Sequence, residues 1–61
     1  MILIVFYVDR KIYASRTLPC VPRRGDVAIF KGKKYLVAHV DWVFSSYSVG
    51  YEYYVKISLI E

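Results

Sequence analysis

The sequence predicts an all-β protein, with five short strands in a strongly bent antiparallel sheet or a small barrel. Three features predict this fold class. Runs of β-branched and aromatic residues alternate with glycine and proline turns, helical spacing of apolar residues is nearly missing, and the longest run changes the phase of its alternation partway. Because 61 residues are too few for two cores, residues 1–61 are expected to form one domain.

The first two strands are expected to form a hairpin. Residues 2–8 are β-branched, aromatic or leucine throughout, residues 9–11 are a short polar break, and residues 12–18 continue as the second strand. The next segment, residues 18–22, contains two prolines that lack the N–H donor of a paired strand. We therefore expect a crossover loop that leads into a turn at residues 24–26.

The third strand is expected to be short and the fourth long. Residues 27–30 precede a tight turn, in which Gly32 supplies the positive φ that such turns require. Residues 35–44 form the fourth strand, but its apolar positions change phase partway. The apolar residues before the change are Tyr35 and Val37, and those after it are Val40, Trp42 and Phe44. One inserted residue restores a common face, which predicts a bulge near Ala38 and His39.

A loop over residues 45–50 then leads to the last strand, residues 52–61. Its alternation predicts that Tyr53, Val55, Ile57 and Leu59 face the core, and that Glu52, Tyr54, Lys56 and Ser58 face out. Five short strands, one strongly bent, suit a small closed sheet without exposed edges. An SH3-like barrel is the first expectation, and an open twisted meander completed by a neighbouring subunit is the alternative.

Part of the chain resembles a group of known proteins. The pattern consists of Leu18-Pro19, Pro22, Gly25-Asp26, Gly32-Lys33, Tyr35, Val37, Val40 and Trp42. It resembles short phage and prophage proteins, mostly of unknown function, which are expected to be small SH3-like β-barrels. Similar Gly-Asp and Gly-Lys turns occur in SH3-like nucleic-acid-binding domains. The resemblance covers roughly the middle half of the chain and implies a fold, but no catalytic residue.

Size and composition favour self-association. A domain this small buries only about 60% of its unfolded surface. One cysteine excludes an intrachain disulfide, and one histidine with one cysteine is too few for a structural zinc site. Hydrophobic residues reach 57% and aromatic residues 18%, which is rich for a small monomer. A homo-oligomer is therefore expected.

The sequence predicts no enzyme, no metal and no cofactor. A nucleophile needs a base and a group that orients it, and His39 is the only imidazole. We expect His39 to be partly buried and bonded to the backbone, with the bulge separating it from Asp41. Cys20 is expected to be a small buried side chain, and Asp26 to cap a turn. The Gly32-Lys33 pair lacks the rest of a phosphate-binding loop motif.

A cytoplasmic location is expected, in the host if the protein is phage-encoded. The longest apolar run, residues 1–8, is too short to span a bilayer. It also lacks the basic start and cleavage site of a signal peptide. A free cysteine suits a reducing compartment, and no membrane partner is expected.

Anionic ligands are the first predicted partners, because the net charge is +4 and five of the nine basic residues lie between positions 23 and 34. We expect capture of a phosphate-bearing ligand, either nucleic acid or a nucleotide signal, by basic turns and exposed tyrosines. The predicted binding residues are Arg23, Arg24, Lys31, Lys33, Lys34, Tyr47, Tyr51 and Tyr54. Because the strand of residues 27–30 separates the two basic turns, the arginines and the lysines are expected at its opposite ends.

The alternative prediction is a protein-interaction module. Residues 2–8 are apolar on both faces, and a small barrel has only one interior. Leu3, Val5 and Tyr7 on the second face are therefore predicted to form an interface. It would serve a homo-oligomer, or would dock on a host or defence protein and inhibit it.

Overall fold

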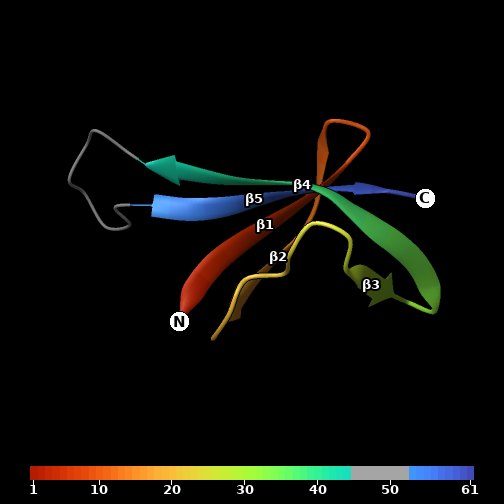
Figure 1. The fold of residues 1–61 in the computed structure, drawn as a ribbon, viewed down its shortest axis with the longest axis horizontal. Helices are drawn as coiled ribbons and strands as arrows, with labels where there is room; N and C mark the ends of the chain where they lie inside the picture. Colours follow the sequence, from red (N-terminus) through yellow and green to blue (C-terminus); the bar gives the residue numbers. More distant parts are fainter. Residues whose placement is uncertain (45–52) are drawn as a thin grey trace.

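The computed structural model describes residues 1–44 and 53–61. They form five strands and no helix: β1 (Ile2–Val8), β2 (Lys11–Leu18), β3 (Val27–Phe30), β4 (Lys33–Phe44) and β5 (Tyr53–Ile60) (Figure 1). The predicted all-β fold with five strands is confirmed, and the bounds differ by at most two residues. The predicted loop of residues 45–50 lies outside the described residues, as do Tyr47, Tyr51 and Glu52.

The five strands form one mixed sheet in the order β2-β1-β5-β4-β3. Neighbouring strands are antiparallel except β1 and β5, which are parallel. The prediction of a purely antiparallel sheet is wrong for this pair. Each strand runs opposite to the one before it in the chain, so β1, β3 and β5 all point the same way. Residues 19–26 carry the chain from one edge of the sheet to the other, so that β3 and β4 lie on the far side and β5 becomes the neighbour of β1. Because β1 and β5 point the same way, their pairing is parallel.

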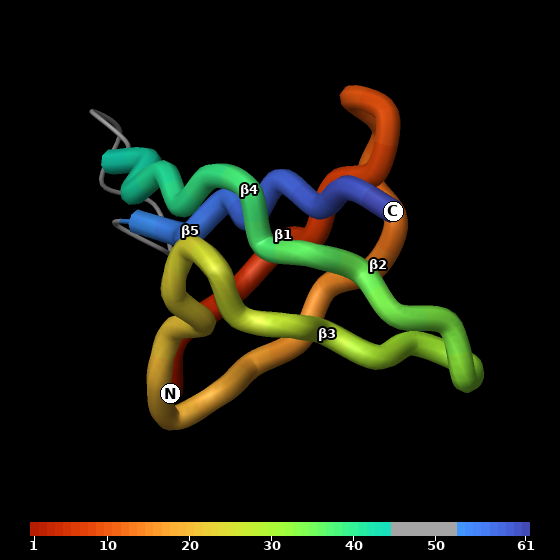
Figure 2. Tube along the Cα trace, turned by 45° about the vertical axis from the view of Figure 1, so that its right-hand side comes forward, coloured from red at the N-terminus to blue at the C-terminus, as the bar shows by residue number. Residues whose placement is uncertain are grey.

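The sheet curls into a half-barrel whose two edge strands, β2 and β3, approach each other (Figure 2). These edges share no strand pairing. They meet instead through aromatic side chains, which we call the seam cluster: Phe6, Tyr13, Phe30 and Tyr35. The ring centroid of Phe30 lies 5.1 Å from that of Phe6 and 5.4 Å from that of Tyr13. Side-chain packing therefore closes the curl where a full barrel would have backbone hydrogen bonds.

The core lies on the concave face of the sheet. Its buried residues are Ile4, Phe6, Tyr35, Val37, Val55, Ile57 and Leu59. The predicted bulge is confirmed, because the register between β4 and β5 shifts between Val37 and His39. After the shift, Val40 lies opposite Ile57 and Trp42 opposite Val55, so the second half of β4 keeps facing the core side.

The ends of β4 and β5 extend beyond the core. The pairing of β1 with β5 covers Val55 to Leu59 and stops before Tyr53. Tyr53 has the predicted inward direction, but it is exposed, and no described strand covers it. The concave face therefore continues onto an arm without a covering strand among the described residues, and we define this uncovered arm as residues 40–44 with residues 53–55.

Glycine turns place the connections as the sequence predicts. Gly25 and Gly32 have φ values of 95° and 81°, a region that glycine adopts without strain. The turn at residues 23–26 is closed by the Arg23 N–H, which donates to Asp26 Oδ2 at 2.8 Å. Its backbone is tied to β4 because the Gly25 N–H donates to the Val37 carbonyl at 2.9 Å. The prediction that Asp26 caps a turn is confirmed.

The turns at residues 9–10 and 31–32 lie toward the same end of the sheet as the C terminus (Figures 1 and 2). The turn at residues 23–26 lies at the other end of β3. The structure thus separates the arginines from the lysines, as expected from the sequence. In the part of the chain that the structure describes, no helix is long and apolar enough to cross a membrane.

Replacing Phe30 by leucine should destabilise the fold, because it removes the ring that contacts the other three members of the seam cluster. Each aromatic pair contributes about 0.5–1.5 kcal/mol beyond its buried area. We expect Phe30→Leu to lower the free energy of unfolding by about 2 kcal/mol in urea denaturation. The matched control is Ile29→Leu at an exposed neighbour, which should change it by less than about 0.5 kcal/mol. Equal effects of the two variants would contradict closure through the seam cluster.

The seam should also weaken at alkaline pH. Hydrogen bonding to Tyr13, burial and the charge of Tyr13 raise the pKa of Tyr35 above its ordinary value of 10.0. The folded state thus favours the neutral phenol, so its contribution is complete below pH 10.0 and is lost as the pH rises through the raised pKa. Urea denaturation should show a smaller alkaline loss of stability for Tyr35→Phe and Tyr13→Phe than for the parent chain. An identical loss in all three proteins would be inconsistent with this pairing.

Candidate functional site

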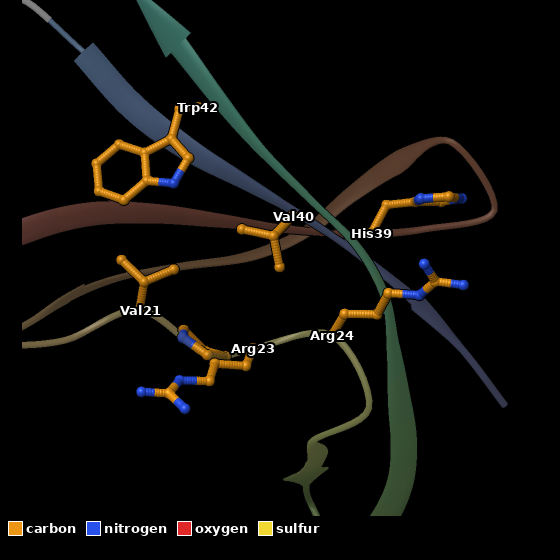
Figure 3. Close-up of a pocket in the computed structure, with 7 residues that line it drawn as sticks. Val21, Arg23, Arg24, His39, Val40 and Trp42 are labelled. Carbon is orange, nitrogen blue, oxygen red and sulfur yellow. The ribbon is translucent and has the colours of Figure 1, made fainter.

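The main candidate site is an open groove between the loop after β2 and the middle of β4 (Figure 3). Its volume is about 540 Å³, within the range of roughly 300–1,000 Å³ that is usual for small-ligand sites. We call it the arginine groove. It is lined by Val21, Pro22, Arg23, Arg24, His39, Val40 and Trp42.

The turn at residues 23–26 places the two arginines on one wall of this groove. Its hydrogen bonds to β4 hold the backbone of Arg23 and Arg24 beside the bulge. Both side chains are exposed. Among residues 1–44 and 53–61, the one ion pair joins Lys33 and Glu61, so neither guanidinium forms an ion pair with a described carboxylate. Two unpaired guanidiniums on an ordered turn are suited to binding an anion.

The opposite wall is apolar and comes from β4. Val40 lies in the middle of the groove, with Trp42 on one side and the Arg24 and His39 side chains on the other (Figure 3). Trp42 faces the concave side, because its partner in β5 is the buried Val55. It is nevertheless about half exposed, since it lies on the uncovered arm. The groove therefore offers the flat ring of Trp42 at one end and the Arg24 guanidinium at the other, while the Arg23 side chain extends toward the Val21 side (Figure 3).

The sequence-based interpretation of His39 is wrong. Its side chain is exposed rather than partly buried. The extra residue of the bulge is Ala38, so His39 and Asp41 both follow it and pair with Ser58 and Lys56. These partners are two residues apart in β5, which puts His39 and Asp41 on the same outer face. No described side-chain hydrogen bond joins them.

Of the six predicted ligand-binding residues that the structure describes, Arg23 and Arg24 are the only two that line one groove. Lys31 lies at the far end of β3 and lines a second depression, at the seam, with Arg16. Lys33 pairs with Glu61 and lies over the Tyr35 ring, 5.6 Å from its centroid.

The remaining predicted residues lie elsewhere. Lys34 is exposed opposite Ile29. Tyr54 is half-buried on the outer face rather than fully exposed. Tyr47 and Tyr51 lie outside the described residues.

Trp42 was not predicted to be a site residue. The signal was present, because the phase change in residues 35–44 puts Trp42 and Phe44 on the core face. What the sequence did not reveal is that β1 ends its pairing before this arm. Two residues expected to pack in a core are therefore available to a ligand.

The predicted interface is largely covered within the chain. Leu3, Val5 and Tyr7 are half-buried, and the Lys56 ammonium lies 4.7 Å from the centre of the Tyr7 ring. More exposed aliphatic side chains lie on the outer face of the other half of the sheet. They are Val27, Ile29, Leu36 and Ile60.

The described residues include no metal-binding group, since no three His, Cys, Asp or Glu side chains gather among them. Cys20 is exposed, which contradicts the expectation of a buried side chain. The reason is its place in the crossover loop between two prolines, outside the sheet.

Comparison with protein-family models, curated proteins and solved structures finds no match for this chain. The resemblance to short phage proteins therefore stays a prediction.

Proposed function

We propose that this protein is a non-catalytic binding module that captures a phosphate-bearing ligand, a nucleotide or nucleic acid, in the arginine groove. One observation carries the proposal: Arg23 and Arg24, without described carboxylate partners, line the same groove as the half-exposed ring of Trp42. The arginines suit the phosphate groups of a nucleotide, and the Trp42 ring suits its planar base.

The two walls contribute different kinds of interaction. A guanidinium donates parallel hydrogen bonds to phosphate oxygens and is weakly hydrated, so it binds phosphate well at a surface. Stacking of a base on an aromatic ring contributes about 1–3 kcal/mol and tolerates any base. Lys31 and Lys34 are remote from the groove and add long-range attraction only.

The cellular setting is part of the proposal. The net charge of +4 and the exposed Cys20 fit a reducing compartment that contains nucleotides and nucleic acids. A cytoplasmic protein, in the host cytoplasm if phage-encoded, meets both conditions.

Removing the groove's charge should weaken ligand binding. For the double variant Arg23→Gln/Arg24→Gln, we expect at least about tenfold weaker binding of a labelled oligothymidylate in fluorescence anisotropy. Losing two phosphate contacts should also reduce the salt slope by about 1.4, at roughly 0.7 per contact for single strands. The matched control, Lys33→Gln/Lys34→Gln, removes the same charge away from the groove and should bind nearly as tightly as the parent chain.

Two results would contradict the proposal. One is equal loss of affinity in both double variants, because net charge alone would then explain binding. The other is that neither the oligonucleotide nor ATP binds at low salt. Binding of ATP is measured as a rise in the melting temperature of the protein.

We also propose a second function, self-association through the outer face of β3, β4 and β5. Val27 lies opposite Leu36, and Leu36 lies opposite Ile60, so these exposed side chains form one row across three strands. A two-fold dimer brings the same patch of both copies together. An apolar row can pack against its own copy, whereas a basic patch would repel its own copy. This row replaces Leu3, Val5 and Tyr7 as the proposed interface, because those side chains are half-buried within the chain.

Charge placed in this row should dissociate the dimer. The parent chain has a mass of 7.2 kDa, and light scattering at high concentration should report about twice this value. Leu36→Glu should give the monomer mass, since a dimer would bring two carboxylates together in an apolar contact. Thr17→Glu, on the exposed part of β2, should stay dimeric. A monomeric parent chain at millimolar concentration would refute self-association.

A further inference from the structure

We propose that the ligand of the arginine groove is an unstacked single strand of nucleic acid, which continues from the groove along a row of aromatic rings on the arm. This inference rests on the proposed function and narrows its ligand class. The row, which we call the aromatic strip, consists of Trp42, Tyr53 and Phe44.

The aromatic strip is continuous with the arginine groove. Trp42 belongs to both, because it lines the groove and lies 5.8 Å from Tyr53 between ring centroids. Tyr53 in turn lies 6.1 Å from Phe44, its partner across the β4–β5 pair. All three residues are on the concave side, since Trp42 lies opposite the buried Val55 and Phe44 opposite Tyr53, two residues before Val55.

The three rings are accessible along the whole strip. Their exposed fractions are 48% for Trp42, 38% for Tyr53 and 71% for Phe44. Exposed aromatic side chains in a row are unusual on a small protein, where such residues normally complete the core. Here the core ends before the arm, so the rings have no described strand above them.

The spacing of the rings favours an extended single strand. Stacked nucleotides rise about 3.4 Å per step, whereas the ring centroids are 5.8 and 6.1 Å apart. Adjacent bases must therefore separate from one another to stack on successive rings. A duplex cannot do this without breaking base pairs, and a mononucleotide can occupy only one ring.

The distribution of charge along the arm is consistent with a nucleic-acid backbone. Asp41 is the one acidic residue within the described strands of the arm, and it lies opposite Lys56 on the outer face. The concave side thus presents aromatic rings from the arm, and the turn that carries Arg23 and Arg24 adds positive charge beside them. Because stacking on an aromatic ring tolerates any base, we expect bases to bind with little sequence preference.

Trp42 provides a direct test, because it is the only tryptophan of the chain. Its fluorescence is followed during titration with thymidine monophosphate, oligothymidylates of increasing length and a duplex. Base stacking should quench the emission, and affinity should rise with length up to about four nucleotides. The duplex should bind at least about tenfold more weakly than the single strand of the same length.

The variant that isolates the strip is Phe44→Leu, which removes its outermost ring and keeps an apolar side chain. We expect about tenfold weaker binding of the oligothymidylate and unchanged binding of the mononucleotide. Tyr54→Leu makes a comparable change on the outer face of β5 and should leave both affinities unchanged. Circular dichroism of the two variants confirms that the fold is retained.

The outcomes separate this inference from the proposed function. If the mononucleotide binds as tightly as the oligomers and Phe44→Leu has no effect, the inference is overturned while the arginine groove remains a nucleotide site. If no ligand quenches Trp42 or binds, both fail. If Phe44→Leu lowers the mass in light scattering and leaves oligonucleotide affinity unchanged, the strip is a contact between copies and the inference is overturned.

Discussion

The packing of Phe30 against Phe6, Tyr13 and Tyr35 is the interaction on which the rest of the structure depends. The two edges of the sheet are not paired with each other, so aromatic side chains join them where a closed barrel would have backbone hydrogen bonds. A five-stranded sheet that flattened would expose its seven buried side chains, a large loss for so short a chain. The cluster therefore maintains both the core and the concave face that carries the candidate site.

The candidate site forms where the bulge in β4 lies beside the turn at residues 23–26. The bulge after Val37 turns the second half of β4 back toward the concave side, which brings Val40 and Trp42 into the groove. The Arg23–Asp26 turn is bonded to the same region through Val37. One short stretch of β4 thus fixes the apolar wall and holds the turn that carries the positive wall. Because both walls depend on backbone hydrogen bonds, the groove is preorganised for the ligand that we propose.

The sequence predicts where each strand lies along the chain, but it does not predict which strands are neighbours in the sheet. Alternation identified all five strands, the bulge near Ala38 and the inward direction of Trp42. The glycine turns and the cap at Asp26 followed from local chemistry. The parallel pairing of β1 with β5 did not, because alternation defines a face and not the strand beside it. For the same reason the exposure of Trp42 and His39 was not predictable, since it depends on which strand covers each position. The separation of the arginines from the lysines was predictable, because the strand of residues 27–30 lies between them in the sequence.

The central claim is that the concave side of the arm and the adjacent turn form the ligand-binding surface. The most direct test is backbone amide mapping by nuclear magnetic resonance during titration with a short oligothymidylate. The predicted result is a set of chemical-shift changes confined to Val21, Arg23 and Arg24, to residues 39–44 and to Tyr53, with the turn at residues 31–32 unaffected. Changes centred on that turn and on Lys33 and Lys34, with none at Trp42, would contradict the account.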